Sequence, residues 1–287
     1  MKIDLNLCFP QLKEFIFHEE TIKNASICTV YNYYRDLILF FKYIKSIKKE
    51  TNTNDKIENT DITDIDTKFL SSITYEEIEQ YFFYLKSVKN NNAATRKRRV
   101  ISLRNFFRFL NLTVEVIDSD PTKKLVTPKL NRSLPKFMLE EECIALLNSI
   151  DGTNKERDYC IFVLFINSGI RLSELVGLNY IDIDRQGDVV IRGKGSKERR
   201  IIFNKACLEA LAEYEKFKEI HYQNKERDRD AVFVGRTGKR LTARRIEQIV
   251  KQRITAAGFG GRALSPHKLR HTAATVMYRR GVAVSYT

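Results

Sequence analysis

The chain has 287 residues, 43% of them hydrophobic, which is enough for about two folded domains and excludes disorder throughout. Its 50 lysines and arginines against 36 acidic residues give a formal net charge of +14. That excess favours nucleic acid or another anionic surface as partner. Charge alone does not distinguish such a protein from a merely soluble basic one.

Cysteine usage and hydropathy exclude further classes of protein. The five cysteines are scattered and form no CxxC pair, so the sequence predicts neither a disulfide framework nor a zinc site. No stretch approaches the roughly 18 uninterrupted apolar residues of a membrane span. We therefore expect a soluble, cytoplasmic protein with no membrane association.

The first part of the chain has helical periodicity. Apolar residues recur at helical spacing over 29–47, 75–88 and 95–110, and a polar stretch at 49–59 is expected to be a loop or insertion. We expect residues 1–115 to form an N-terminal helical domain.

The third of these helices begins with four consecutive basic residues, Arg96, Lys97, Arg98 and Arg99. One interpretation is a solvated helix face. The alternative is a DNA-binding surface, which charge segregation favours: residues 50–79 are mainly acidic, whereas 96–136 are mainly basic.

A basic, proline-containing linker is expected at 116–136, since Pro121, Pro128 and Pro135 alternate there with lysines and an arginine. Beyond it, residues 137–287 combine helices with a β-hairpin. Helices are predicted at 140–148, 157–167, 206–222 and 243–257, and strands at 188–192 and 200–203. The predicted fold class is therefore mainly α (α+β), with one small antiparallel sheet.

Arg171 follows the glycine that ends the apolar helix at 157–167, so a turn between two packed helices could present it from a rigid base. Glu174 lies three residues further on and could orient the guanidinium. The alternative is an ordinary surface ion pair, which contributes little.

The predicted hairpin turn carries Lys194 between two glycines that allow close approach to a ligand. Lys194 could protonate a leaving oxygen or enter a DNA groove, or could merely aid solubility. Lys197 and Arg199 extend this positive patch and are interpreted as DNA phosphate contacts.

Near the chain's end, Ser265 and Pro266 suit the N-cap and first position of a helix. His267 and Arg270 then lie three residues apart on one face. A histidine can move a proton and an arginine can bind a phosphate oxygen. The alternative is a capping histidine beside a surface arginine; His271 is interpreted as structural.

Three motifs in this order, SGIRLSEL, GKGSKER and HKLRHT, resemble the catalytic domain of tyrosine recombinases of the phage integrase family, most of all the Xer-type resolvases. The resemblance extends to TVYNYYRDLILFFKYI and TRKRRVISLRNFFRFL, which are similar to the family's SAM-like, core-binding domain. It therefore covers nearly the whole chain.

The resemblance implies a site and a reaction. Arg171 and Arg270 would clamp the scissile phosphate, Lys194 would protonate the leaving 5′ oxygen, His267 would assist proton transfer, and Glu174 would support Arg171. A tyrosine would form a 3′-phosphotyrosine bond with double-stranded DNA, without metal, ATP or other cofactor. Four recombinase subunits, identical or of two kinds, would assemble on two DNA sites.

The sequence departs from the family pattern after Gly281, because the family's Leu-Gly-His segment is absent and Tyr286 comes early for a nucleophile. We expect a truncated chain in which the catalytic domain lacks its C-terminal end and is inactive. Two alternatives are a DNA-binding remnant that occupies recombination sites and a shortened enzyme that uses Tyr286. A nicking-closing activity of the type IB topoisomerase kind is a further alternative.

Overall fold

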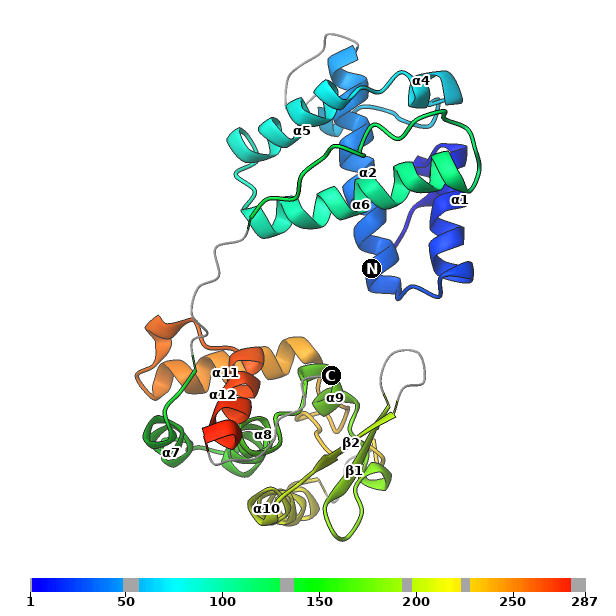
Figure 1. Ribbon diagram of the computed structural model, residues 1–287. Helices are drawn as coiled ribbons and strands as arrows, with labels where there is room; N and C mark the ends of the chain where they lie inside the picture. The colour runs from blue at the N-terminus through cyan, green and yellow to red at the C-terminus, as the bar shows by residue number, and fades with distance from the viewer. Residues whose placement is uncertain (1, 49–56, 130–136, 193–197, 223–227, 280–287) are drawn as a thin grey trace. The chain divides into compact units, whose positions relative to one another are not determined.

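The computed structural model describes residues 2–48, 57–129, 137–192, 198–222 and 228–279. Contacts divide the chain into two compact units, Met1–Arg132 and Ser133–Thr287. Among the residues described, helices predominate and one two-stranded antiparallel sheet is present, which confirms the predicted fold class (Figure 1).

The first unit is helical among its described residues. Its α-helices are α1 (Pro10–Phe17), α2 (Ile27–Lys48), α4 (Thr67–Ser71), α5 (Tyr75–Ser87) and α6 (Ala93–Leu112). The three longest are the helices predicted from periodicity; α1 and α4 are too short to give a clear periodic signal. Side-chain caps fix where α5 and α6 start. The Thr74 side chain accepts a hydrogen bond from the backbone N–H of Glu77, and the Asn92 side chain accepts one from the backbone N–H of Thr95.

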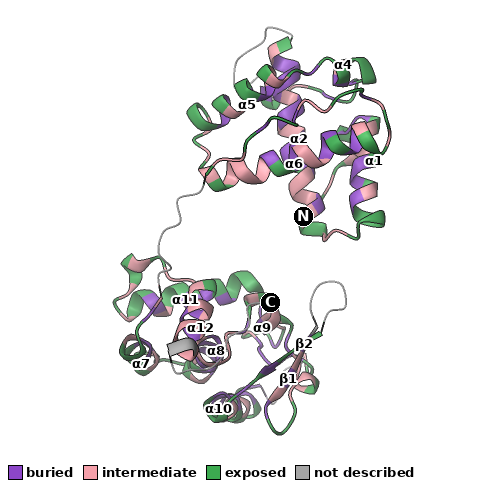
Figure 2. Ribbon diagram, in the orientation of Figure 1, coloured by how far each residue is buried: buried purple, intermediate pink, exposed green. Residues whose placement is uncertain are grey.

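Helix α2 packs against α1, α5 and α6, and buried residues of these helices form one core (Figure 2). Many of the side chains in this core are aromatic. Phe41 meets Phe9 edge-on with ring centroids 4.8 Å apart, and Phe106 lies 5.4 Å from Phe41. All three rings are fully buried, and each such burial contributes about 1.5–3 kcal/mol. Residues after α6 join this core through Ile117 and Leu125, so part of the basic segment packs on the first unit.

The second unit contains the helices α7 (Glu140–Asn148), α8 (Lys155–Ser168), α9 (Leu172–Gly177), α10 (Lys205–His221), α11 (Ala243–Ala256) and α12 (Pro266–Arg279). Helix α8 is its centre, with α7, α10 and α12 packed against it (Figure 1). Its residues 160–165 are all buried, as the continuous apolar run predicts.

The two strands, β1 (Asp188–Arg192) and β2 (Glu198–Ile202), pair in register from Asp188 opposite Ile202 to Arg192 opposite Glu198. Strand β2 begins and ends slightly before its predicted limits. Residues 193–197, between the two strands, were predicted to form the hairpin turn and lie outside the described structure. No helix within the described ranges is both long and apolar enough to cross a bilayer.

Candidate functional site

The turn between α8 and α9 presents Arg171. Gly169 ends α8 in the left-handed conformation, with φ of 60°, which glycine adopts without strain. Arg171 is then the N-cap of α9, and its backbone N–H donates to Glu174 Oε2 at 2.7 Å. The start of α9 thereby fixes the backbone from which the Arg171 side chain projects.

The Glu174 carboxylate joins two arginines. Its Oε1 accepts from Arg171 Nη1 at 2.7 Å and from Arg199 Nε at 3.0 Å, while Oε2 accepts from Arg199 Nη2 at 2.5 Å. The Glu174 side chain is 7% exposed. Burial acts most strongly on this group and raises its pKa, but hydrogen bonds from Arg199 and Arg171 together outweigh it and hold the pKa of Glu174 below its usual value.

Helix α12 brings the second arginine to the same turn. Leu269 and Thr272 are fully buried and anchor the helix, and the Thr272 hydroxyl accepts from Met138 N at 3.0 Å. The Arg270 guanidinium donates to the carbonyl of Gly169, just ahead of Arg171. A Cβ on Gly169 would lie 3.5 Å from Ala273 Cβ, so α12 packs closely on the turn.

Arg171, His267 and Arg270 line one pocket of about 480 Å³. Its walls come from the α8–α9 turn, from α11 and from the start of α12. The structure thus brings together three of the four residues predicted to be catalytic. The fourth, Lys194, lies outside the described residues, as do Lys197 and Tyr286.

His267 has a histidine neighbour. Its Nε2 lies 3.0 Å from Nε2 of His271, one helical turn away, so one nitrogen donates to the other. Burial first, and then the charges of His267, Lys268 and Arg270, lower the pKa of His271. The ring of His271 is thus a hydrogen-bond partner for His267 at the edge of the pocket.

The basic start of α6 divides into two kinds of residue. Arg98 Nη1 lies 2.5 Å from Asp36 Oδ2, and Arg99 Nη1 donates to the Tyr81 hydroxyl at 2.9 Å. Arg96 donates to the backbone carbonyl of Asn91, and no hydrogen bond or ion pair joins Lys97 to the described residues. Arg98 and Arg99 thus have structural partners, whereas Arg96 and Lys97 keep uncompensated charges.

Sequence reasoning missed two features of the site, one in the pocket and one beside Arg171. Glu247, on α11, lines the pocket beside the basic groups, and no local motif marks this residue. The pairing of Arg199 with Glu174 was also unforeseen, because the two residues are 25 positions apart and meet only after folding. Side chains along a strand alternate between two faces, and on β2 Arg199 is half-buried between exposed neighbours. This alternation was the signal in the sequence that could have distinguished Arg199 from the exposed residues beside it.

Known proteins resemble this chain over nearly its whole length. Residues 136–286 match the model of the phage integrase family. The tyrosine recombinase XerC of Caldanaerobacter subterraneus subsp. tengcongensis is 38% identical over 272 residues, covering 95% of this chain and 76% of the relative. The XerC of Chlamydia trachomatis serovar L2 is 30% identical over 273 residues, covering 93% and 84%.

Solved structures share the fold at low identity. The site-specific recombinase XerH bound to its difH substrate has a TM-score of 0.67 and 20% identity, covering 94% of this chain and 73% of that one. A lambda integrase dimer bound to a COC′ core site has a TM-score of 0.62 and 16% identity, covering 94% and 87%. These structures show the shared fold, while the family match and the XerC relatives show that the chain belongs to the phage integrase family, as a tyrosine-type site-specific recombinase of the XerC kind.

Proposed function

We propose that the pocket lined by Arg171, His267 and Arg270 binds the scissile phosphodiester of double-stranded DNA. The observation that carries the proposal is the convergence of these three side chains, which come from distant parts of the sequence. Two guanidinium groups would neutralise the nonbridging oxygens as charge develops on them. The basic composition and the DNA complexes of XerH and lambda integrase support DNA as the partner.

The proposed reaction is a transesterification. A tyrosine Oη attacks phosphorus, the P–O5′ bond breaks, and a 3′-phosphotyrosine bond forms. Lys194 supplies the proton for the leaving 5′ oxygen, and His267 moves a proton at the nucleophile. The arginines provide the positive charge and the phosphotyrosine retains the bond energy, so we expect cleavage in EDTA and without ATP.

We further propose that subunits assemble as tetramers on two DNA sites, identical or of two kinds. Attack by the freed 5′-hydroxyl of one strand on the phosphotyrosine of another would then exchange strands. The lambda integrase dimer on its core site supports assembly on DNA.

A nicked suicide duplex tests the chemistry, because the short strand that carries the freed 5′-hydroxyl diffuses away and leaves the covalent protein–DNA adduct trapped. We expect an adduct that Arg171→Gln and Arg270→Gln each reduce by about 100- to 1,000-fold, the usual effect of removing one charge-stabilising group. Arg185→Gln, an exposed arginine outside the pocket, is the matched control.

The same substrate identifies the nucleophile. Loss of the adduct in Tyr286→Phe would assign that role to Tyr286. Duplex binding without any adduct would refute strand cleavage by this chain and favour a DNA-binding function at recombination sites. An adduct equally strong in Arg171→Gln would refute the proposed clamp.

A further inference from the structure

A second pocket in the catalytic unit has no role in the proposed reaction. It has a volume of about 570 Å³ and lies where the start of α8 meets the start of α11. Among the described residues that line it are Arg157, Arg236 and Arg245, and none of the described lining residues is acidic. A concave site with three arginines and no carboxylate in its wall suits an anion.

Arg157 gives this pocket a buried cationic base. Its side chain is only 5% exposed. Its Nε and Nη2 donate to Asp158 Oδ1 at 2.9 and 2.7 Å, and Nη1 donates to Asn154 Oδ1 at 3.3 Å. A guanidinium carries five N–H groups, and these contacts with described residues use three. Two donors thus remain for a ligand oxygen, and a buried donor gains most from finding one.

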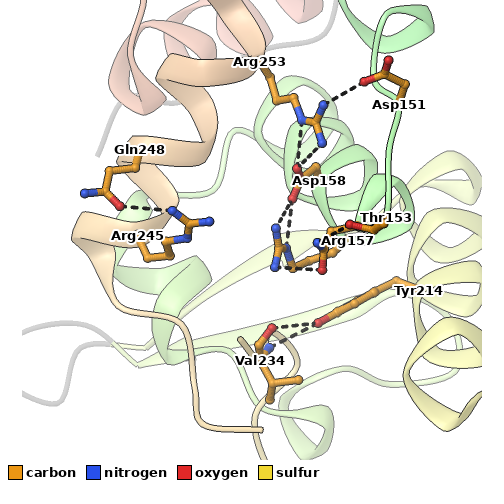
Figure 3. A network of polar contacts seen from close by, with 10 residues as sticks. Asp151, Thr153, Arg157, Asp158, Tyr214, Val234, Arg245, Gln248 and Arg253 are labelled. Carbon is orange, nitrogen blue, oxygen red and sulfur yellow. Dashed lines mark hydrogen bonds and ion pairs between the residues drawn. The ribbon is translucent and has the colours of Figure 1, made fainter. Parts of the chain in front are cut away.

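The neighbouring carboxylate does not fully neutralise Arg157, because a second arginine shares it (Figure 3). Arg253 Nε donates a hydrogen bond to Asp158 Oδ2 at 2.9 Å, and Arg253 Nη2 lies 2.8 Å from the same oxygen. Arg157 uses the other carboxylate oxygen, Oδ1. Arg253 reaches further to Asp151 Oδ1 at 3.1 Å, but the Asp151 side chain is 90% exposed and well solvated. The cluster therefore places two arginines, Arg157 buried and Arg253 half-buried, around the one buried aspartate, with the second carboxylate in solvent.

The mouth of the pocket adds further positive charge. Arg245 is exposed, and its Nη1 contacts the neutral amide oxygen of Gln248 at 3.3 Å (Figure 3). Helix α8 begins at the same place, and its N-cap residue, Asn154, makes no side-chain capping bond. The positive end of this 14-residue helix adds to the field of the arginines, offset in part by Glu156 and Asp158 in its first turn.

We propose that this pocket is a phosphate-binding site distinct from the catalytic pocket. Arg157 would hold one phosphate oxygen at the base, while Arg236 and Arg245 contact the others from the mouth. Helix α11 separates the two pockets: Ala243 and Glu247, four residues apart on one face, line the catalytic pocket, whereas Arg245 lies on the opposite face. The ligand is a phosphate group, carried either by a DNA backbone or by a small free phosphate.

Titration with inorganic phosphate tests the site without requiring DNA or strand cleavage. The readouts are the side-chain Nε–H resonance of Arg157 and the thermal midpoint, with chloride at matched ionic strength as reference. We expect a saturable response that the double variant Arg236→Ala/Arg245→Ala weakens at least tenfold. Both residues are exposed, so the variant should fold, and circular dichroism verifies that it does.

The matched control is Arg229→Ala, which removes an exposed arginine that does not line the pocket. It should bind phosphate as the parent does. A response that chloride reproduces, or that survives in the double variant, would overturn the proposal.

Duplex binding at several salt concentrations distinguishes the two sources of phosphate. If DNA supplies it, the double variant should flatten the slope of log K against log salt by about one to two units relative to the control. If a free phosphate is the ligand, the phosphate response should be lost while the slope is unchanged. Either result is consistent with a phosphate-binding site in this pocket. Neither depends on the outcome of the adduct assay for the catalytic pocket.

Discussion

Glu174 accepts hydrogen bonds from Arg199 through both carboxylate oxygens, at 3.0 and 2.5 Å, and also binds the side chain and backbone N–H of Arg171. Arg199 is the second residue of β2. One carboxylate thus connects the start of β2 to Arg171 at the start of α9. We infer that Glu174 positions both of these parts.

Replacing Glu174 by Gln keeps its shape but removes the charge that both arginines share. We expect the free energy of unfolding to fall by about 1–3 kcal/mol, the usual contribution of charge-assisted hydrogen bonds. Urea denaturation at pH 7 measures this change. Glu213→Gln breaks an exposed pair with Lys216 and should alter stability by less than about 1 kcal/mol.

The stability lost in Glu174→Gln should also depend on pH. Because the pKa of Glu174 is lowered in the folded chain, its ionised form contributes stability above the unfolded pKa, near 4.5, and that contribution disappears as pH falls through the folded value. The difference between the parent and Glu174→Gln should therefore shrink between pH 6 and pH 3. A constant difference would mean that the carboxylate charge contributes nothing.

Gly187, in the turn before β1, is a second point where the backbone restricts the residue type. Its φ is +87°, and a Cβ there would overlap the carbonyl oxygen of Phe203. Gly187→Ala should destabilise the second unit by about 1–3 kcal/mol through backbone strain and this clash. Thermal denaturation checks it, with Gly261→Ala, where a Cβ meets open space, as a neutral control.

The fold could be predicted from the sequence because its signals are local. The long helices of the first unit, the buried run of α8 and the paired strands all follow from periodicity, caps and turn residues. The meeting of Arg171 with Arg270 was predicted only through family resemblance. Periodicity cannot say that Arg270 reaches Gly169, because that contact depends on how α12 packs on α8.

The basic run at the start of α6 shows a second limit of sequence reasoning. Four consecutive charges appear equivalent in the sequence, yet consecutive helical residues point in different directions. Asp36, on α2, is 2% exposed and pairs with Arg98 and Arg99. Which charges remain for DNA is thus decided by a neighbouring helix.

Arg96→Gln and Lys97→Gln should each flatten the slope of log K against log salt for duplex DNA by about one unit, if each contacts one phosphate. Lys68→Gln, an exposed lysine on α4, is the control and should leave the slope unchanged. Unchanged slopes in both α6 variants would mean that this face does not meet DNA.

Arg99→Gln should act on stability instead. Its side chain is 14% exposed, and removing it leaves the buried Asp36 carboxylate with one arginine fewer. We expect the free energy of unfolding to fall by about 2–4 kcal/mol in chemical denaturation. A stable variant with weakened DNA binding would instead make Arg99 a phosphate contact.

The histidine pair on α12 predicts a pH effect near neutrality. The pKa of His271 is lowered from 6.5 by burial and then by the positive charge of His267, Lys268 and Arg270. The unfolded chain consequently binds this proton more readily, so the free energy of unfolding should fall as pH drops below about 6.5. Titration of the His271 ring protons by NMR should give a midpoint below 6.5.

Removing one neighbouring charge should move that midpoint back toward 6.5, because less repulsion opposes the imidazolium. Lys268→Gln removes such a charge and keeps the backbone carbonyl that accepts a hydrogen bond from the Thr272 hydroxyl. Lys251→Gln, on α11, should leave the midpoint where it was. If Lys268→Gln has no effect, burial alone sets the pKa of His271; if the parent midpoint lies above 6.5, the pair instead stabilises a shared positive charge.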